Sequence, residues 1–203
     1  KKPVTLAEYV SRMGEEQNHI YYACGDSIEK IDKLPQTEAV RDRGFEILYC
    51  TDDIDEFALR VLQQSGGKEF KSVSAGDLGF DTPEEKEEQK KQTEQNKDLF
   101  DAMTNALDGK VKEVRLSKRL KTHPVCLASE GELSLEMEKV LNAMPTENKV
   151  KAERVLEINE NHAIFNALKA VHEQNPDKLK DYAQILYTQA MLIEGMPVED
   201  PVD

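Results

Sequence analysis

Apolar residues at helical spacing alternate with short runs of strand-forming residues along the first third of the chain. Leu6, Tyr9, Val10 and Met13 recur at the spacing of one helix face. The run from Ile20 to Cys24 is rich in residues that favour strands. The same reasoning predicts helices over 5–13, 35–44 and 55–62 and strands over 20–24, 45–50 and 70–73, with Gly25, Asp26 and Ser27 turning from the first strand into a further helix. This alternation predicts a small α/β unit with a parallel pair of strands.

A break in this periodicity at 75–83 predicts a domain boundary. Gly76 and Gly79 interrupt the pattern, and Asp81 and Thr82 can cap the helix that follows. Beyond the break we expect one long helix over 83–107 in a polar and an apolar half, strands over 111–116, 125–128 and 154–158, a helix over 134–144, and two last helices opening at Asn161 and at Asn175 with Pro176. The expected fold class is therefore mixed: a small α/β domain over 1–80 and an α+β domain over 81–203 that ends in a helical bundle.

The helix expected over 134–144 has an apolar stripe with two possible meanings. Leu135 stands on another face of this helix. The stripe, at positions i, i+4, i+7, i+8 and i+11, consists of Leu133, Met137, Val140, Leu141 and Met144. It can be the core face of a packed helix. It can also be an exposed binding surface, because Met side chains adapt to many partners and Gly131 and Pro145 flank the segment.

The final helix carries more apolar surface than one chain can cover. Apolar residues form a stripe along one face of this helix, and Ile185 and Leu192 extend the stripe further around its circumference. A helix that is apolar over most of its circumference needs packing partners on two sides. We therefore expect self-association through the two last helices, with Ile164, Leu168, Leu179, Tyr182, Ile185, Leu186, Ala190 and Ile193 in the interface.

Charge and cysteine usage narrow the class of protein. The formal net charge of −13 on 203 residues disfavours nucleic acid and anionic membranes as partners, since both require clustered Lys and Arg. Three cysteines at unrelated spacings indicate reduced thiols, with Cys24 and Cys50 in the core. Whether Cys126 is redox-regulated stays open. Neither a signal pattern nor a membrane-spanning apolar run is present in the sequence.

The sequence gives little support for a metal-binding or nucleotide-binding site. The acidic residues of 52–56 lack the calcium-loop pattern, and we expect Asp53 and Asp55 to cap the helix whose apolar positions are Phe57, Ala58, Val61 and Leu62. The four His residues do not have metal-ligand spacing. The sequence contains neither a P-loop nor a dinucleotide-binding glycine motif. We therefore expect no metal site, no cofactor and no catalytic residue in this chain.

A series of motifs along the chain resembles the 90-kilodalton heat-shock protein family of chaperones, in its bacterial form. It starts with Met13, Gln17, the IYY of Ile20–Tyr22 and the turn at Gly25–Ser27. The matching segments that follow are Gly44–Phe57, Phe70–Leu78, Val111–Leu120, His123–Ser129, Leu133–Met144, Leu156–His162 and Met191–Pro201. Gly14 and Ala163 depart from the family pattern without chemical consequence.

The resemblance implies the distal part of the middle domain followed by the carboxy-terminal dimerisation domain. It implies that the stripe on the 134–144 helix contacts client proteins and that the last helices form a homodimer through a four-helix bundle. The family has one more helix after the EDP motif, so the missing initial Met and the stop at Asp203 indicate a piece of a longer cytoplasmic protein. ATP and Mg²⁺ would bind the intact protein in a domain that this piece lacks, and the piece itself would not be an enzyme.

Two other classes of protein compete with this interpretation. An α/β enzyme would have its site where the first strands end, near Asp26, Ser27, Thr51 and Asp52. That arrangement lacks a nucleophile paired with a base. A stand-alone acidic adaptor is the other alternative, and an open reading frame upstream of Lys1 would distinguish it from a fragment.

Overall fold

Two small sheets organise the protein in the computed structural model, which describes residues 3–145 and 148–198. The first sheet contains β1 (His19–Cys24), β2 (Ile47–Cys50), β3 (Gln64–Ser65) and β4 (Lys68–Ser72) in the order β2-β1-β4-β3. The second contains β5 (Glu113–Leu116), β6 (Val125–Glu130) and β7 (Glu153–Ile158) in the order β5-β7-β6. Both sheets mix parallel and antiparallel pairs, so the mixed fold class predicted from the sequence is confirmed.

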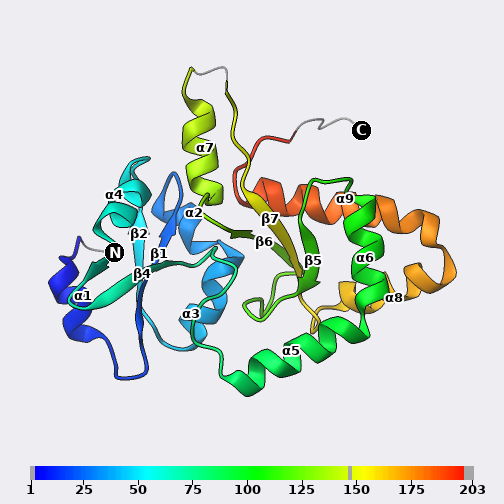
Figure 1. The fold of residues 1–203 in the computed structure, drawn as a ribbon, viewed down its shortest axis with the longest axis horizontal. Coiled ribbons are helices and arrows are strands. Elements are labelled where there is room, and N and C mark those ends of the chain that lie inside the picture. The colour runs from blue at the N-terminus through cyan, green and yellow to red at the C-terminus, as the bar shows by residue number, and fades with distance from the viewer. Residues whose placement is uncertain (1–2, 146–147, 199–203) are drawn as a thin grey trace.

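The first sheet lies among short helices, at the left of Figure 1. Strand β1 is parallel to both β2 and β4, which confirms the predicted parallel pair. The accompanying helices are α1 (Leu6–Arg12), α2 (Ile28–Asp32), the 3₁₀ helix η1 (Pro35–Thr37), α3 (Glu38–Asp42) and α4 (Asp55–Leu62). The helix expected over 35–44 is thus a 3₁₀ turn followed by α3, and β3 was not predicted. One apolar cluster on this sheet contains Tyr21, Ile31 and Val40, and another contains Tyr22, Cys50 and Leu59.

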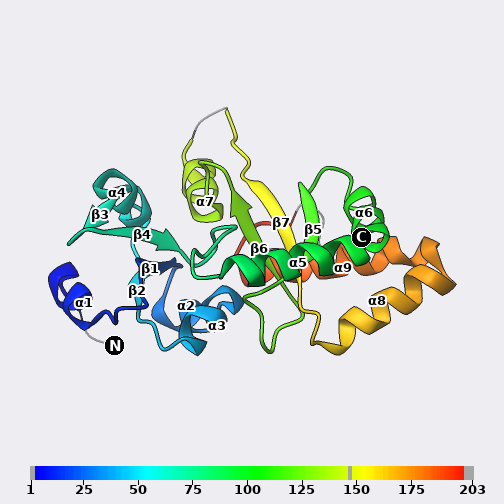
Figure 2. The ribbon, with the colours of Figure 1, turned by 60° about the horizontal axis from the view of Figure 1, so that its bottom comes forward.

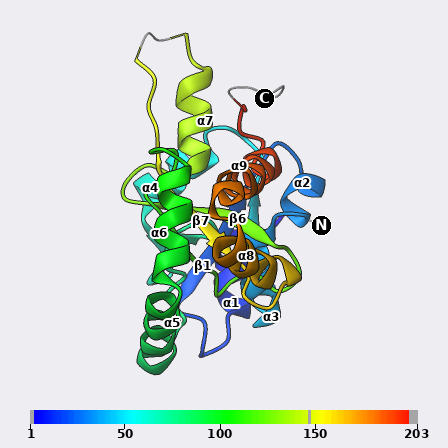
Figure 3. The ribbon, with the colours of Figure 1, turned by 90° about the vertical axis from the view of Figure 1, so that its right-hand side faces the viewer.

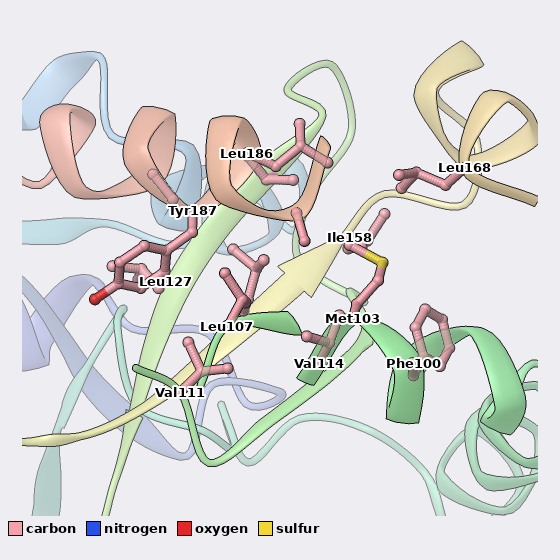
Figure 4. Packing of buried hydrophobic residues seen from close by; sticks show 14 of the residues in the cluster. Phe100, Met103, Leu107, Val111, Val114, Leu127, Ile158, Leu168, Leu186 and Tyr187 are labelled. Atoms are coloured by element: carbon pink, nitrogen blue, oxygen red, sulfur yellow. The ribbon is translucent and has the colours of Figure 1, made fainter. Parts of the chain in front are cut away.

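The second half of the chain contains the helices α5 (Pro83–Gln95), α6 (Lys97–Ala106), α7 (Leu135–Ala143), α8 (Ala163–Gln174) and α9 (Pro176–Ile193). Of these, α6 and α9 pack on the second sheet and α8 packs against both of them (Figures 1 and 2). The largest buried cluster joins strands β5–β7 to α6, α8 and α9, and Figure 4 shows Met103, Leu127 and Ile158 at its centre. Burial of this apolar surface is the main stabilising contribution to this half of the molecule.

Several helix ends differ from the sequence prediction. The helix expected over 83–107 is two helices, because the backbone leaves helical geometry at Asn96. Thr82 caps α5 as predicted, in a reciprocal capping box with Glu85. Helix α8 is capped by His162 rather than Asn161, and Asn175 makes no side-chain capping bond to α9. Ile54 occupies the N-cap of α4, while Asp55 accepts a hydrogen bond from the Asp52 amide, so the predicted capping by Asp53 and Asp55 is wrong.

Candidate functional site: an anchored, projecting helix and an exposed face of the last helix

Helix α7 projects from the body of the molecule (Figures 1 and 3). Its first turn is fixed by Ser134, whose hydroxyl accepts a hydrogen bond from the Met137 amide at 3.0 Å. The same hydroxyl donates to Glu56 Oε2 on α4 at 2.6 Å. Glu56 is buried and also accepts a hydrogen bond from Tyr22 of β1 at 2.9 Å. The base of α7 is therefore tied to the first sheet through one buried carboxylate.

A second buried carboxylate, Glu138, ties α7 to the second sheet. It accepts hydrogen bonds from the Arg154 guanidinium on β7 and from the Ala152 amide, the latter at 2.8 Å. Arg154 in turn donates to the Tyr187 hydroxyl of α9 at 2.6 Å. A rotation of α7 would separate Glu138 from Arg154 and leave two buried charges unpaired, which is costly. These contacts therefore fix the orientation of α7.

The predicted stripe on α7 lies outside the buried clusters. Leu135, which the sequence placed on another face, is the apolar core residue of the helix, at 1% exposure. Leu133 is half-buried and packs against the large cluster. Met137, Val140 and Leu141 are half-buried, and Met144 is 46% exposed. Within the described part of the chain, these last four residues are in none of the core clusters. The stripe therefore has accessible apolar surface.

Helix α4 adds apolar surface beside α7 that the sequence analysis missed. The two helices pack against each other. Val61 is 84% exposed, Ile54 is 73% exposed and Leu62 is 54% exposed. The sequence analysis gave Val61 and Leu62 as apolar positions of this helix, but the buried residues of α4 are Glu56 and Leu59. Leu59 has Asp55, Glu56 and Gln63 at i−4, i−3 and i+4, so no apolar stripe in the sequence marks its face as the buried one.

The residues expected in the dimer interface divide into two groups. Leu168, Leu179, Leu186 and Ala190 are buried in the core of the chain itself. Figure 4 shows Leu168 on α8 and Leu186 on α9 directed toward the sheet. Ile164 and Ile193 are half-buried, each packed on a core cluster. The accessible members are Tyr182 and Ile185, which are 37% and 63% exposed.

An apolar groove runs along the exposed face of α9. Its volume is about 560 Å³, and Ile185, Thr188, Leu192 and Ile193 are among its lining residues. Leu192 is 64% exposed and lies two helical turns beyond Ile185. Exposed large apolar side chains grouped on one helix face mark an interaction surface.

A buried ion-pair network joins the two sheets. Arg119 and Arg115 both donate to Glu157 of β7, at 2.7 Å and 3.0 Å. Arg119 also donates to the backbone carbonyl of Ala75, in the segment that follows the first sheet, at 2.7 Å. Burial by itself would raise the pKa of Glu157, but the charges of the two arginines outweigh burial and leave that pKa lowered. Both halves of the molecule are thus held by one ionised carboxylate and its arginines.

The residues of the rival enzyme site have local structural contacts. Ser27 caps α2 by accepting a hydrogen bond from the Lys30 amide, and Asp26 forms an ion pair with Lys30. Thr51 and Asp52 are exposed. Among residues 3–145 and 148–198, no group of three or more His, Cys, Asp or Glu side chains has the geometry to hold a metal ion. None of the helices in that part of the chain is long and apolar enough to cross a membrane.

Comparison with known proteins gives one family. A family model described as "Hsp90 protein" matches residues 1–203. Similar curated proteins, each named "Chaperone protein HtpG", come from Clostridium acetobutylicum, 64% identical over 202 residues, Bacillus subtilis, 59% identical over 203, and Halalkalibacterium halodurans, 60% identical over 202. In each comparison the match covers 100% of this chain and 32% of the relative. The chain therefore spans about a third of the length of these relatives.

Proposed function

Because the chain belongs to the Hsp90 protein family, we propose that it is the client-contact and dimerisation region of a molecular chaperone that assists protein folding under stress. Residues 1–80 would be the distal part of the middle domain, and residues 81–203 the carboxy-terminal dimerisation domain. The order of the sequence motifs and the exposed apolar faces of α7 and α9 support this assignment. The partners would be a second copy of the chain and partly folded proteins, in the cytoplasm, rather than nucleic acid or membrane.

The observation that carries the client-contact proposal is the combination of a fixed base and an accessible stripe on α7. Ser134 and Glu138 anchor the helix through buried carboxylates, while Met137 and Met144 lie outside the cores. Flexible thioether side chains on a rigid support can pack against many apolar sequences. Val61 and Leu62 of α4 would extend the same surface.

Replacement of Met137 tests this proposal. Met137→Gln, alone and with Met144→Gln, should weaken binding of a permanently unfolded protein such as carboxymethylated α-lactalbumin, followed by fluorescence anisotropy. Met137 lies outside the core clusters and Met144 is exposed, so thermal unfolding should change far less than for a core substitution. Leu135→Ala is the matched control on the buried face and should cost about 2–5 kcal/mol of stability. A large loss of stability in Met137→Gln, or unchanged client binding, would contradict the proposal.

We further propose that this chain neither binds nor hydrolyses ATP, although the intact chaperone would use ATP and Mg²⁺. The sequence has no glycine-rich phosphate loop leading into a helix N-terminus. Calorimetry with Mg-ATP on the chain should give no binding heat. Saturable heat would put a nucleotide site inside these residues and overturn the assignment to the distal middle and carboxy-terminal domains, while leaving the family membership intact.

A further inference from the structure

Two of the three cysteines are direct neighbours at the end of a strand pair. Strands β1 and β2 are parallel, and Cys24 and Cys50 are register partners at the last position of the ladder. The strands stay paired beyond them, because the Gly25 amide donates to the Cys50 carbonyl at 3.2 Å. Both side chains belong to the cluster of Tyr22 and Leu59, on one face of the sheet. Register partners on parallel strands direct their side chains to the same face of the sheet, so the two thiols are neighbours.

The pair differs from the third cysteine in access and in neighbours. Cys24 is half-buried and lines a cavity of about 360 Å³, whose apolar walls include Ile31, Leu34 and Leu192. Cys126 is 1% exposed, and its thiol contacts the Glu157 carboxylate. Cys50 is 7% exposed and does not line this cavity, so a small uncharged reagent would reach the pair through Cys24, whereas Cys126 is enclosed.

The surroundings of the pair favour the protonated thiol over the thiolate. The hydrogen bond to Cys50, burial and the negative charge of Glu56 all raise the pKa of the Cys24 thiol. Reactions that need a thiolate are correspondingly slow at such a site. Paired strands lie about 4.7–4.9 Å apart, which brings the two sulfur atoms near enough to share one bridging atom. A reagent that accepts two neutral thiols and bridges them through an added atom suits this site better than thiol–disulfide exchange, which needs a thiolate.

We propose that Cys24 and Cys50 form a dithiol site for trivalent arsenicals. In the reaction, a dihydroxy arsenical RAs(OH)₂ meets two thiols. Two As–S bonds form, two As–O bonds break, and each hydroxide leaves as water with one thiol proton. Arsenic stays trivalent, so no oxidant is needed, and the adduct is uncharged beside Glu56. The cavity next to Cys24 is lined by Ile31, Leu34 and Leu192 and also by charged side chains such as Lys30, Lys139 and Glu194, and its apolar wall can accommodate an aryl group on the arsenic. The bridge would link the edge strand β2 covalently to β1 at the foot of α4.

The probe is phenylarsine oxide, added in equimolar amount to the folded chain. Intact-mass measurement should show one adduct, and thiol titration after unfolding should find one free thiol instead of three. Digestion of the adduct should give a single arsenic-linked pair of peptides, one with Cys24 and the other with Cys50. This result needs no variant. A small dithiol should remove the adduct and restore all the thiols.

Single substitutions then assign the site. Cys24→Ser and Cys50→Ser should each abolish the adduct, whereas Cys126→Ser, the matched control, should retain it. Circular dichroism of each variant would establish that it is folded, and the peptide map of the unaltered chain decides the matter if a variant is not. An adduct that includes Cys126, or three free thiols after equimolar treatment of the unaltered chain, would overturn the proposal.

Discussion

At the scale of single residues, Glu194 links several elements and titrates near neutral pH. It lies at the C-terminal end of α9 and is buried. Its carboxylate accepts a hydrogen bond from Gln36 of η1, and its carbonyl accepts one from Lys139 of α7 at 3.1 Å. Burial raises the pKa of Glu194 to about 7, with Glu136 acting in the same direction and Lys139, Gln36 and Arg119 opposing. The folded protein therefore holds a proton here that the unfolded chain releases at lower pH.

The sign of the resulting pH dependence follows from linkage. Below the ordinary glutamate pKa of 4.5, Glu194 is protonated in both states. Between 4.5 and about 7 only the folded state keeps the proton, so the stabilising contribution is lost as pH rises through this window. At about 1.4 kcal/mol for each pH unit, the loss is on the order of 3 kcal/mol.

Glu194→Gln should remove this pH dependence. The amide cannot ionise, and its oxygen can still accept from Gln36. The variant should therefore be more stable than the unaltered chain at pH 8, with a smaller difference at pH 5, as measured by urea unfolding at both values. Glu157→Gln is the contrasting control: it removes a carboxylate whose pKa is lowered by its arginines, and it should be destabilising at both values. A Glu194→Gln chain that is less stable at pH 8 would contradict the expected sign.

Buried charges mark the limit of prediction at this scale. The apolar stripe on α7 could be recognised from spacing alone. The burial of Glu56, Glu138 and Glu157 could not, because their partners are distant in sequence. Ionised side chains are almost always exposed unless paired, so a local pattern assigns them to the surface. On α4, the spacing picks out Val61 and Leu62 as apolar positions, yet both are exposed while Glu56 is buried.

At the scale of elements, most helices and strands could be predicted, but their junctions could not. The strands β1, β2, β6 and β7 follow from short apolar runs bounded by turns. The break between α5 and α6 at Asn96 gave no clear signal, since Asn is tolerated inside helices. The two helices differ in what they cover: α5 buries none of its side chains, whereas α6 buries Leu99, Phe100 and Met103. The direction of α6 is set by its packing on β5. Local residue spacing carries no information about this packing, so the break between α5 and α6 could not be predicted.

At the scale of the whole molecule, the two sheets are joined by contacts between distant segments. Gln36 of η1 donates to the Leu127 carbonyl of β6 at 2.8 Å. The Ser129 amide of β6 donates to the Ser74 carbonyl at 2.9 Å. These bonds lie next to the Arg119 and Glu157 network, so separating the sheets would expose several buried polar groups together. We therefore expect the two halves of this chain to move as one body when α7 or α9 binds a partner.

The surface left on α9 determines how two copies would meet. The sequence argument counted Leu186 as uncovered, yet it is 4% exposed because α9 packs on β6 and α6. The apolar area that remains free belongs to Tyr182, Ile185 and Leu192. Burying a large apolar side chain contributes roughly 1.5–3 kcal/mol, so these residues can drive a two-fold symmetric contact. The interface is expected to be narrower than the sequence suggested.

We predict that the chain self-associates through this face and dissociates on dilution, because the free apolar area is confined to a few side chains. Ile185→Asp and Leu192→Asp should each shift sedimentation toward monomer without changing thermal unfolding, because a charge placed there stays in water in the monomer but is buried in the dimer. Leu186→Asp is the matched control one residue away: it puts the charge in the core and should unfold the protein. A dimer that tolerates both exposed-face substitutions would put the interface elsewhere, and a chain that is monomeric at every concentration would remove α9 as a dimerisation surface.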